Sequence, residues 1–225
     1  MEIEILSGFL FTKAKSSNSP SWDDLISCND ILPIDTNLHS NSSWRFFIIN
    51  SDIPLQKEDV PNERNIFEYP LVVRKSGEKV ILLSYTRKIV DHCINNIFPR
   101  TFSKFARFLP IEINSLVKHL AYNPNRYVIS FVHARVQAYG EALRAVSFYG
   151  DDVAEVPLFR ENLGFFSCYT CGLRDVTGGG ELIRLGNDGY ISFNYAKSDH
   201  GKKIDLVLSY ISSLGFLTSR SGGEF

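Results

Sequence analysis

The second half of the chain alternates short runs of β-branched and aromatic residues with turn signals, and this pattern limits the folds that it can adopt. Five such runs occur, at residues 126–137, 142–150, 163–175, 179–186 and 189–196. The Asn-Asp-Gly sequence at 187–189 is a strong hairpin signal. Residues 126–225 are therefore predicted to form an antiparallel β-meander, closed by a terminal helix over residues 202–217.

The first half combines strand-like and helix-like patterns. Residues 2–12 and 44–50 alternate as strands do, and residues 68–85 predict a hairpin that turns at Lys-Ser-Gly-Glu-Lys. Residues 86–122 show helical periodicity and predict a central helical block. The expected fold class is α+β: N-terminal strands and hairpin, a central helical block, and a C-terminal antiparallel β-meander closed by a terminal helix. We expect an N-terminal part at 1–125 and the meander at 126–225, or one continuous domain.

Charge is unevenly distributed along this 225-residue chain, although its formal net charge is only −1. Residues 1–72 contain eleven acids and five bases, whereas residues 73–118 contain nine bases and three acids. In one interpretation, the acidic N-terminal part packs beside the basic middle. In the other, the basic middle is a surface that meets an acidic partner or phosphate groups.

The most basic stretch is also rich in phenylalanine. The sequence Phe-Pro-Arg-Thr-Phe-Ser-Lys-Phe-Ala-Arg-Phe-Leu-Pro spans residues 98–110. The candidate anion-binding residues in and before it are Arg87, Lys88, Arg100, Lys104 and Arg107. Proteins that bind single-stranded nucleic acid typically use basic side chains to contact the phosphate backbone and aromatic rings to stack on unpaired nucleobases. The alternative is that the phenylalanines are core and the bases form the solvated face.

A second candidate anion site lies on the strands at 126–137 and 142–150. His133 and Arg135 share one face because strand side chains alternate. If Ala-Tyr-Gly-Glu (138–141) is a tight turn, Arg135 lies opposite Arg144 and His133 opposite Val146. Two facing arginines favour a phosphate group, which guanidinium forks match. Arg174 and Arg184, on later strands, would extend this stripe; alternatively, Glu141, Asp151, Asp175 or Glu181 pair with the arginines.

The Gly-Asp-Asp sequence at 150–152 suggests a second function class. Paired carboxylates at a hairpin tip can hold two divalent metals, so Asp151 and Asp152 are the candidate catalytic residues of a Mg²⁺-dependent enzyme. The neighbouring strand, however, offers His133 and Arg135 where such a site needs further acids. The alternative is that the two aspartates end a strand and cap the segment that follows.

The Cys-x-x-Cys pair, Cys168 and Cys171, resembles half of a zinc site, but the sequence offers no second matched pair of ligands. Cysteines that alternate with aromatic residues in a strand are more often packing residues. No disulfide framework, signal peptide or membrane-length apolar run is recognised, so we expect a cytoplasmic protein with no cofactor, Mg²⁺ and Zn²⁺ being the weak alternatives.

Taken together, these patterns predict a non-catalytic subunit or adaptor of a larger cytoplasmic assembly. We expect it to bind a protein partner and to contact nucleic acid, or another anionic partner, through the basic residues above. The alternative is a small metal-dependent enzyme that acts on nucleotides or nucleic acid through the Gly-Asp-Asp turn. No membrane contact is expected.

Overall fold

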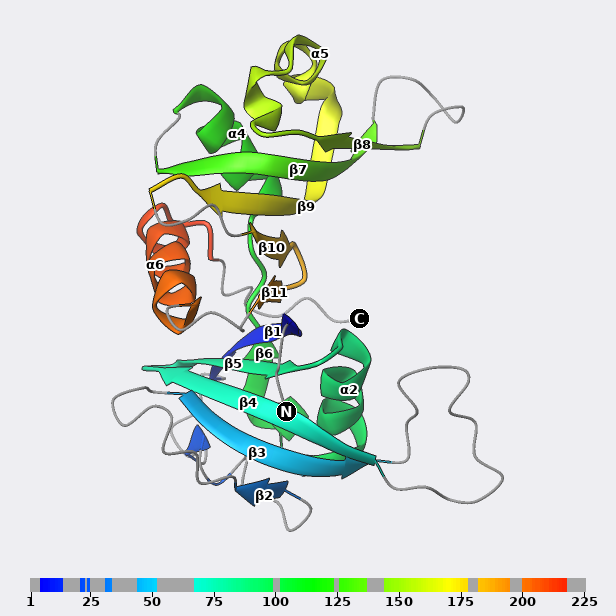
Figure 1. Ribbon diagram of the computed structural model, residues 1–225, viewed down its shortest axis with the longest axis vertical. Coiled ribbons are helices and arrows are strands. Elements are labelled where there is room, and N and C mark those ends of the chain that lie inside the picture. Colours follow the sequence, from blue (N-terminus) through cyan, green and yellow to red (C-terminus); the bar gives the residue numbers. More distant parts are fainter. Residues whose placement is uncertain are drawn as a thin grey trace. The chain divides into compact units, whose positions relative to one another are not determined.

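A computed structural model describes residues 5–13, 21, 22, 24, 31–33, 44–51, 67–98, 102–123, 126–136, 144–177, 182–194 and 200–217. The chain forms two compact units (Figure 1). The N-terminal unit is Leu6–Phe108, and the C-terminal unit is Leu109–Phe225 together with Met1–Ile5. In the N-terminal unit, most described residues belong to antiparallel strands, whereas the C-terminal unit combines an antiparallel sheet with helices.

The strands of the N-terminal unit are β1 (Ile5–Lys13), β2 (Ile31–Pro33), β3 (Trp44–Ser51), β4 (Phe67–Ser76), β5 (Lys79–Ser84) and β6 (Ala106–Phe108). Their order is β2-β3-β4-β5-β1, and β6 also pairs with β1. The predicted hairpin is confirmed, because Ser76 pairs with Lys79. Its turn contains Gly77 at a φ of 57°, a conformation that favours glycine.

The predicted central helical block is wrong. Helix α2 (Arg87–His92) continues as a π-helix (Cys93–Ile97), but α3 (Phe102–Phe105) is a single turn that leads directly into strand β6. The next helix, α4 (Ile113–Tyr122), belongs to the C-terminal unit. In β6, the Phe108 ring lies 5.2 Å from that of Phe9 and 4.6 Å from that of Phe11. These contacts and the pairing with β1 override the local helical periodicity.

The C-terminal unit contains all five predicted strands: β7 (Tyr127–Val136), β8 (Ala145–Tyr149), β9 (Phe166–Asp175), β10 (Leu182–Gly186) and β11 (Tyr190–Asn194). The predicted terminal helix is also confirmed as α6 (His200–Ser213). Between β8 and β9 lie a 3-10 turn (Val153–Glu155), helix α5 (Pro157–Glu161) and a second 3-10 turn (Leu163–Phe165). The Asn-Asp-Gly hairpin forms as predicted, with Gly189 at a φ of 84°.

The prediction of a simple meander is wrong at one connection. The strand order is β11-β10-β9-β7-β8, so the chain leaves β8 at the edge and crosses to the other side of β7 before forming β9. Strands β7 and β9 are ten residues long and pair along most of their length. The five residues of β8 are exposed or half-buried, which suits an edge position. The two long strands, β7 and β9, therefore lie inside the sheet, and the short strand β8 lies at its edge.

One face of this sheet forms the core of the C-terminal unit. Its buried side chains include Val132 and Ala134 from β7, Cys171 and Leu173 from β9, and Leu185 from β10. Helix α4 packs against β7 and β9, and α6 lines a pocket with β10 and β11. We call the opposite side the outer face. None of the helices in the described part of the chain is long and apolar enough to span a membrane.

The fold is therefore mostly antiparallel sheet with few, short helices, and the α+β class expected from a central helical block is corrected accordingly.

Candidate functional site

The register of β7 and β8 differs by one residue from the predicted one. Arg135 lies opposite Ala145 and His133 opposite Ser147, rather than opposite Arg144 and Val146. The backbone carbonyl of Arg144 accepts a hydrogen bond from the N–H of Val136. A shift of one residue moves a side chain to the other face, so Arg144 does not share the face of Arg135. The predicted turn at 138–141 lies outside the described residues.

Three strands meet on the outer face at Gly172. This glycine of β9 pairs with Phe131 of β7 on one side and with Arg184 of β10 on the other. The guanidinium carbon of Arg184 lies 5.6 Å from the centre of the Phe131 ring, in cation–π geometry. A Cβ atom on Gly172 would lie only 2.2 Å from that ring. The absence of a side chain at residue 172 therefore lets the ring lie across β9 and meet the arginine.

A cluster of rings surrounds Phe131 on the same face. The His133 ring lies 5.2 Å from Phe131, 5.7 Å from Tyr149 and 6.3 Å from Tyr169, all between ring centres. His133 Nδ1 and Ser147 Oγ are 2.7 Å apart, a hydrogen bond that holds the imidazole across the strand pair. Phe131 is only 6% exposed, whereas Tyr149 is 69% exposed. The cluster thus has a buried base and an accessible aromatic rim.

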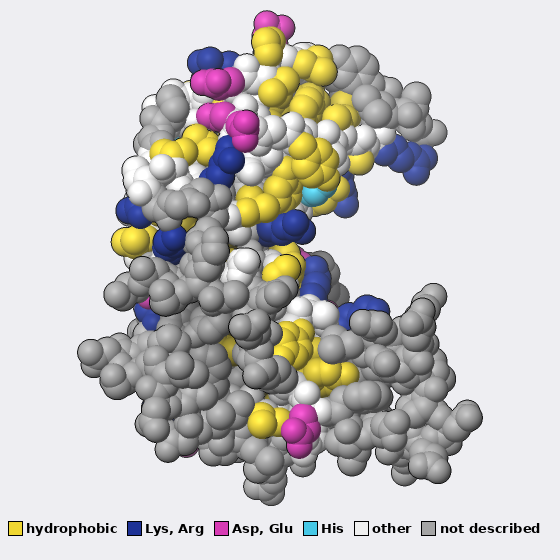
Figure 2. Space-filling model, in the orientation of Figure 1, with side chains coloured by type: hydrophobic (Ala, Val, Ile, Leu, Met, Phe, Trp, Pro, Cys, Tyr) yellow, Lys and Arg dark blue, Asp and Glu magenta, His cyan; other side chains and the backbone are white. Residues whose placement is uncertain are grey.

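Two exposed arginines border these rings. Arg135 follows the same face of β7, and Arg184 covers the Phe131 ring. At the outer-face positions of β7 to β11, the described residues include no acid. Space-filling representation shows a histidine among hydrophobic side chains, with Lys and Arg side chains beside them (Figure 2). We call this surface the aromatic–arginine face; it consists of Phe131, His133, Arg135, Tyr149, Tyr169 and Arg184.

The Gly-Asp-Asp turn has structural partners. The guanidinium of Arg174 donates to the backbone carbonyl of Asp151 and to its Oδ1, the latter at 3.1 Å. Asp152 accepts a hydrogen bond from the N–H of Ala154 at 3.0 Å and so caps the following 3-10 turn. Within the described ranges, no group of three or more His, Cys, Asp or Glu side chains could hold a metal ion. Asp151 therefore pairs with an arginine and Asp152 caps the segment that follows, as in the structural alternative to a metal site.

Cys168 and Cys171 lie together on the core face of β9. Tyr169 is an extra residue in the register of β9 with β7, and this bulge brings the two cysteines to the same side. Both thiols are buried and unpaired by disulfides, and burial raises the pKa of each, that of Cys168 to about 11. A protonated thiol is a poor metal ligand. The structure therefore places these cysteines as packing residues.

The candidate basic residues of the N-terminal unit come from several elements. Arg87 and Lys88 begin α2 and are exposed, and Arg107 is exposed on β6. The guanidinium of Arg87 lies 4.6 Å from the centre of the Phe9 ring and pairs with Asp91. Lys104 belongs to α3, its side chain is not described, and Arg100 lies outside the described residues. As anion contacts, these five basic residues stay predictions.

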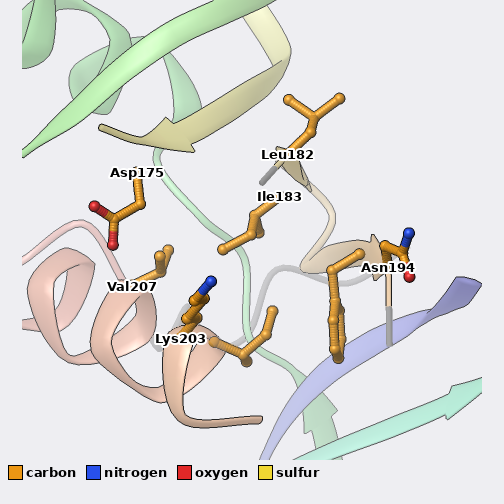
Figure 3. A pocket seen from close by; sticks show the side chains of 8 residues that line it. Asp175, Leu182, Ile183, Asn194, Lys203 and Val207 are labelled. Atoms are coloured by element: carbon orange, nitrogen blue, oxygen red, sulfur yellow. The ribbon is translucent and has the colours of Figure 1, made fainter. Parts of the chain in front are cut away.

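A small pocket, partly open to solvent, lies between α6 and the strands β9 to β11 (Figure 3). It is lined by Asp175, Leu182, Ile183, Phe193, Asn194, Lys203, Ile204 and Val207. Asp175 accepts hydrogen bonds from Arg126, the shorter at 2.6 Å, and from the backbone and hydroxyl of Thr177. These bonds hold the pKa of Asp175 at about 2. The carboxylate of Asp175 therefore has a structural role. The other residues that line the pocket are mostly apolar.

Of the six residues on this face, His133, Arg135 and Arg184 were predicted from the sequence, whereas Phe131, Tyr149 and Tyr169 were missed. Period-two spacing places Phe131, His133 and Arg135 in one row, so that part of the signal was present. The crossing of the Phe131 ring over Gly172 could not be found without the pairing of β7 with β9.

Comparisons with protein-family models, with curated proteins and with solved structures found no match.

Proposed function

We propose that this protein is a non-catalytic, cytoplasmic adaptor or subunit that binds single-stranded nucleic acid through the aromatic–arginine face. The observation that carries the proposal is the largely exposed Tyr149 ring, which lies beside His133 and is bordered by exposed Arg135 and Arg184. Aromatic rings on an open sheet stack on unpaired bases, and arginines contact the phosphates between them. The lack of acids at the described outer-face positions supports an anionic ligand.

Each group has a defined role in this proposal. Tyr149 provides the main stacking surface, and His133, held by Ser147, provides a second ring about 6 Å away. Arg135 and Arg184 contact phosphates on either side of the rings. Two phosphate contacts imply a salt dependence of about −1.4 in log K against log salt, because single strands contribute about −0.7 per contact. Arg87, Lys88 and Arg107 are proposed as additional contacts.

The free thiols support the proposed cytoplasmic location, because the cytoplasm is a reducing compartment. The three described cysteines, Cys93, Cys168 and Cys171, are buried and form no disulfide. The alternative of a metal-dependent enzyme gains no support from the described residues, since Asp151 pairs with Arg174 and Asp152 caps a turn.

The test is fluorescence anisotropy with labelled single-stranded oligonucleotides of about 10 to 20 nucleotides, a length that covers common site sizes. The Tyr149→Ala, Arg184→Ala double variant is compared with a Tyr122→Ala, Arg160→Ala control. Tyr122 is 60% exposed on α4 and Arg160 is exposed on α5, so the control removes the same chemistry outside the aromatic–arginine face. We expect the first variant to bind at least tenfold more weakly than the control, since one stacked base alone is worth about 1–3 kcal/mol. Equal affinities would reject the proposal.

A further inference from the structure

We infer that His133 couples the proposed binding site to pH: it takes up a proton when single-stranded nucleic acid binds, and Ser147 holds its ring in place in both charge states. This inference rests on the proposed function, because it concerns how the aromatic–arginine face holds its ligand. Histidine is the side chain whose charge ordinarily changes between about pH 5 and 8, and a neighbouring anion favours its charged form.

His133 lies among the rings on which a nucleobase is proposed to stack. Its ring centre lies 5.2 Å from that of Phe131, 5.7 Å from that of Tyr149 and 6.3 Å from that of Tyr169. The side chain is half-buried, so part of the imidazole is accessible to a ligand. A nucleotide whose base stacks on the exposed Tyr149 ring therefore brings its phosphate groups within reach of His133.

The partner of the imidazole is a hydroxyl group, which suits both charge states. His133 Nδ1 and Ser147 Oγ are 2.7 Å apart, and the two residues are directly paired across β7 and β8. A hydroxyl can donate to the unprotonated Nδ1 of a neutral imidazole and can accept from the Nδ1–H of a charged one. Ser147 is thus a positioning residue, because it keeps the ring oriented while the charge of the ring changes.

No acid occupies the described outer-face positions of β7 to β11, so no carboxylate at these positions neutralises a protonated His133. The other ionisable side chains of this face on the strands beside it are Arg135 of β7, Tyr149 of β8, Tyr169 and Arg174 of β9, and Arg184 of β10. Arginine stays charged and tyrosine stays neutral between about pH 5 and 8. Arg174 is paired with Asp151. His133 is therefore the described side chain of this face whose charge changes in that range.

Protonation of His133 adds a third positive charge beside Arg135 and Arg184, so the protonated form binds phosphate groups more tightly. By reciprocity, a ligand that prefers the protonated form favours proton uptake, and its affinity rises as the pH falls. Attraction between unit charges about 4 Å apart in water changes a binding constant about fivefold. One more phosphate contact also changes the slope of log K against log salt from about −1.4 to about −2.1.

The test is fluorescence anisotropy with labelled oligothymidylate at about pH 8 and about pH 5.5. Thymine and the phosphodiester backbone keep their charge across this range, so a change in affinity comes from the protein. We expect the wild-type dissociation constant to fall about fivefold from the higher to the lower pH. His133→Phe keeps a ring that cannot be protonated and should lose most of this change. His133→Gln, a second neutral replacement, serves the same purpose if the phenylalanine variant fails to fold.

His119→Phe is the matched control for a general effect of charge. His119 lies on α4, where its ring is 5.9 Å from that of Phe216, outside the aromatic–arginine face. The control also removes one imidazole and should keep the full pH dependence. Ser147→Ala leaves His133 in place but removes the hydroxyl that orients it, so this variant should show a smaller pH dependence. Ser147→Thr keeps a hydroxyl and should restore it.

The outcomes separate this inference from the proposed function. Binding that strengthens equally in the wild type and in His133→Phe as the pH falls would overturn the inference and leave the proposed function intact. An unchanged pH dependence in Ser147→Ala would overturn the positioning role of Ser147. Failure of the wild type to bind at either pH would overturn both the inference and the proposed function.

Discussion

Replacement of Gly172 by alanine tests the packing on which the aromatic–arginine face depends. Alanine in a strand is ordinarily better than glycine by about 0.5–1 kcal/mol, because glycine loses more backbone entropy on folding. Here the added Cβ would lie 2.2 Å from Phe131 Cε1 and 2.7 Å from Leu182 Cδ1. Overpacking of this kind costs about 1–3 kcal/mol. The clash therefore exceeds the gain, and we expect the free energy of unfolding to fall by roughly 1–2 kcal/mol.

A double-mutant cycle with Phe131→Ala identifies the ring as the cause. Phe131→Ala alone should destabilise the protein by about 3 kcal/mol or more, as for other buried phenylalanines. In that background the main clash is gone, because the two nearest atoms belong to the Phe131 ring and the next is the flexible end of Leu182, and Gly172→Ala should be neutral or stabilising.

Urea unfolding of the four proteins, followed by circular dichroism, measures the coupling between the two sites. Gly164→Ala is the matched control, since a Cβ atom there meets nothing within 4 Å. A clash with the Phe131 ring would be excluded if Gly172→Ala destabilised the protein no more than Gly164→Ala, or if its cost were the same with and without that ring.

Three further predictions concern side chains with structural roles. Asp175→Asn should lower the free energy of unfolding at pH 7 by roughly 2 kcal/mol, because the hydrogen bonds from Arg126 hold the folded pKa of Asp175 at about 2. That stabilisation is fully present above the pKa of Asp175 in the unfolded chain, near 3.8, and is lost as the pH falls through about 2. Urea unfolding should therefore show a difference in free energy between the wild type and Asp175→Asn at pH 7 that disappears at pH 2. Asp152→Ala should lower the unfolding free energy by about 1 kcal/mol through loss of its cap, and Asp152→Asn should retain most of it; equal losses would exclude capping. Cys93 and Cys168, whose pKa values burial raises to about 12 and about 11, should be alkylated only after unfolding, and rapid labelling at pH 8 in peptide-resolved mass spectrometry would contradict their burial.

Local patterns predicted the strands of the C-terminal unit because alternation and turn chemistry belong to neighbouring residues. The Asn-Asp-Gly hairpin requires only a few consecutive residues, and its Gly189 adopts the positive φ that the turn needs. Strand β6 could not be predicted in this way. Its partners are Phe11 to Lys13, almost one hundred residues earlier, and no local signal reports that pairing.

The site was predicted only in part, for a related reason. Period-two alternation gave the shared face of His133 and Arg135, but the partner of Arg135 depended on the register, which proved one residue different. The cluster also requires two bulges, at Ser130 of β7 and Tyr169 of β9, which change the face of every later residue relative to simple alternation. Long-range packing sets both the register and the bulges, and a single sequence does not display it.

Photocrosslinking to a single-stranded oligonucleotide that carries 5-bromouracil, with the attached peptides identified by mass spectrometry, tests the central claim most directly. Trypsin cleavage after Arg144 and Arg160 isolates residues 145–160, which include Tyr149. Nucleic-acid binding through the aromatic–arginine face predicts a crosslink on this peptide that disappears in Tyr149→Ala and persists in Tyr122→Ala. Crosslinks confined to other peptides, or a crosslink on residues 145–160 that survives in Tyr149→Ala, would contradict it.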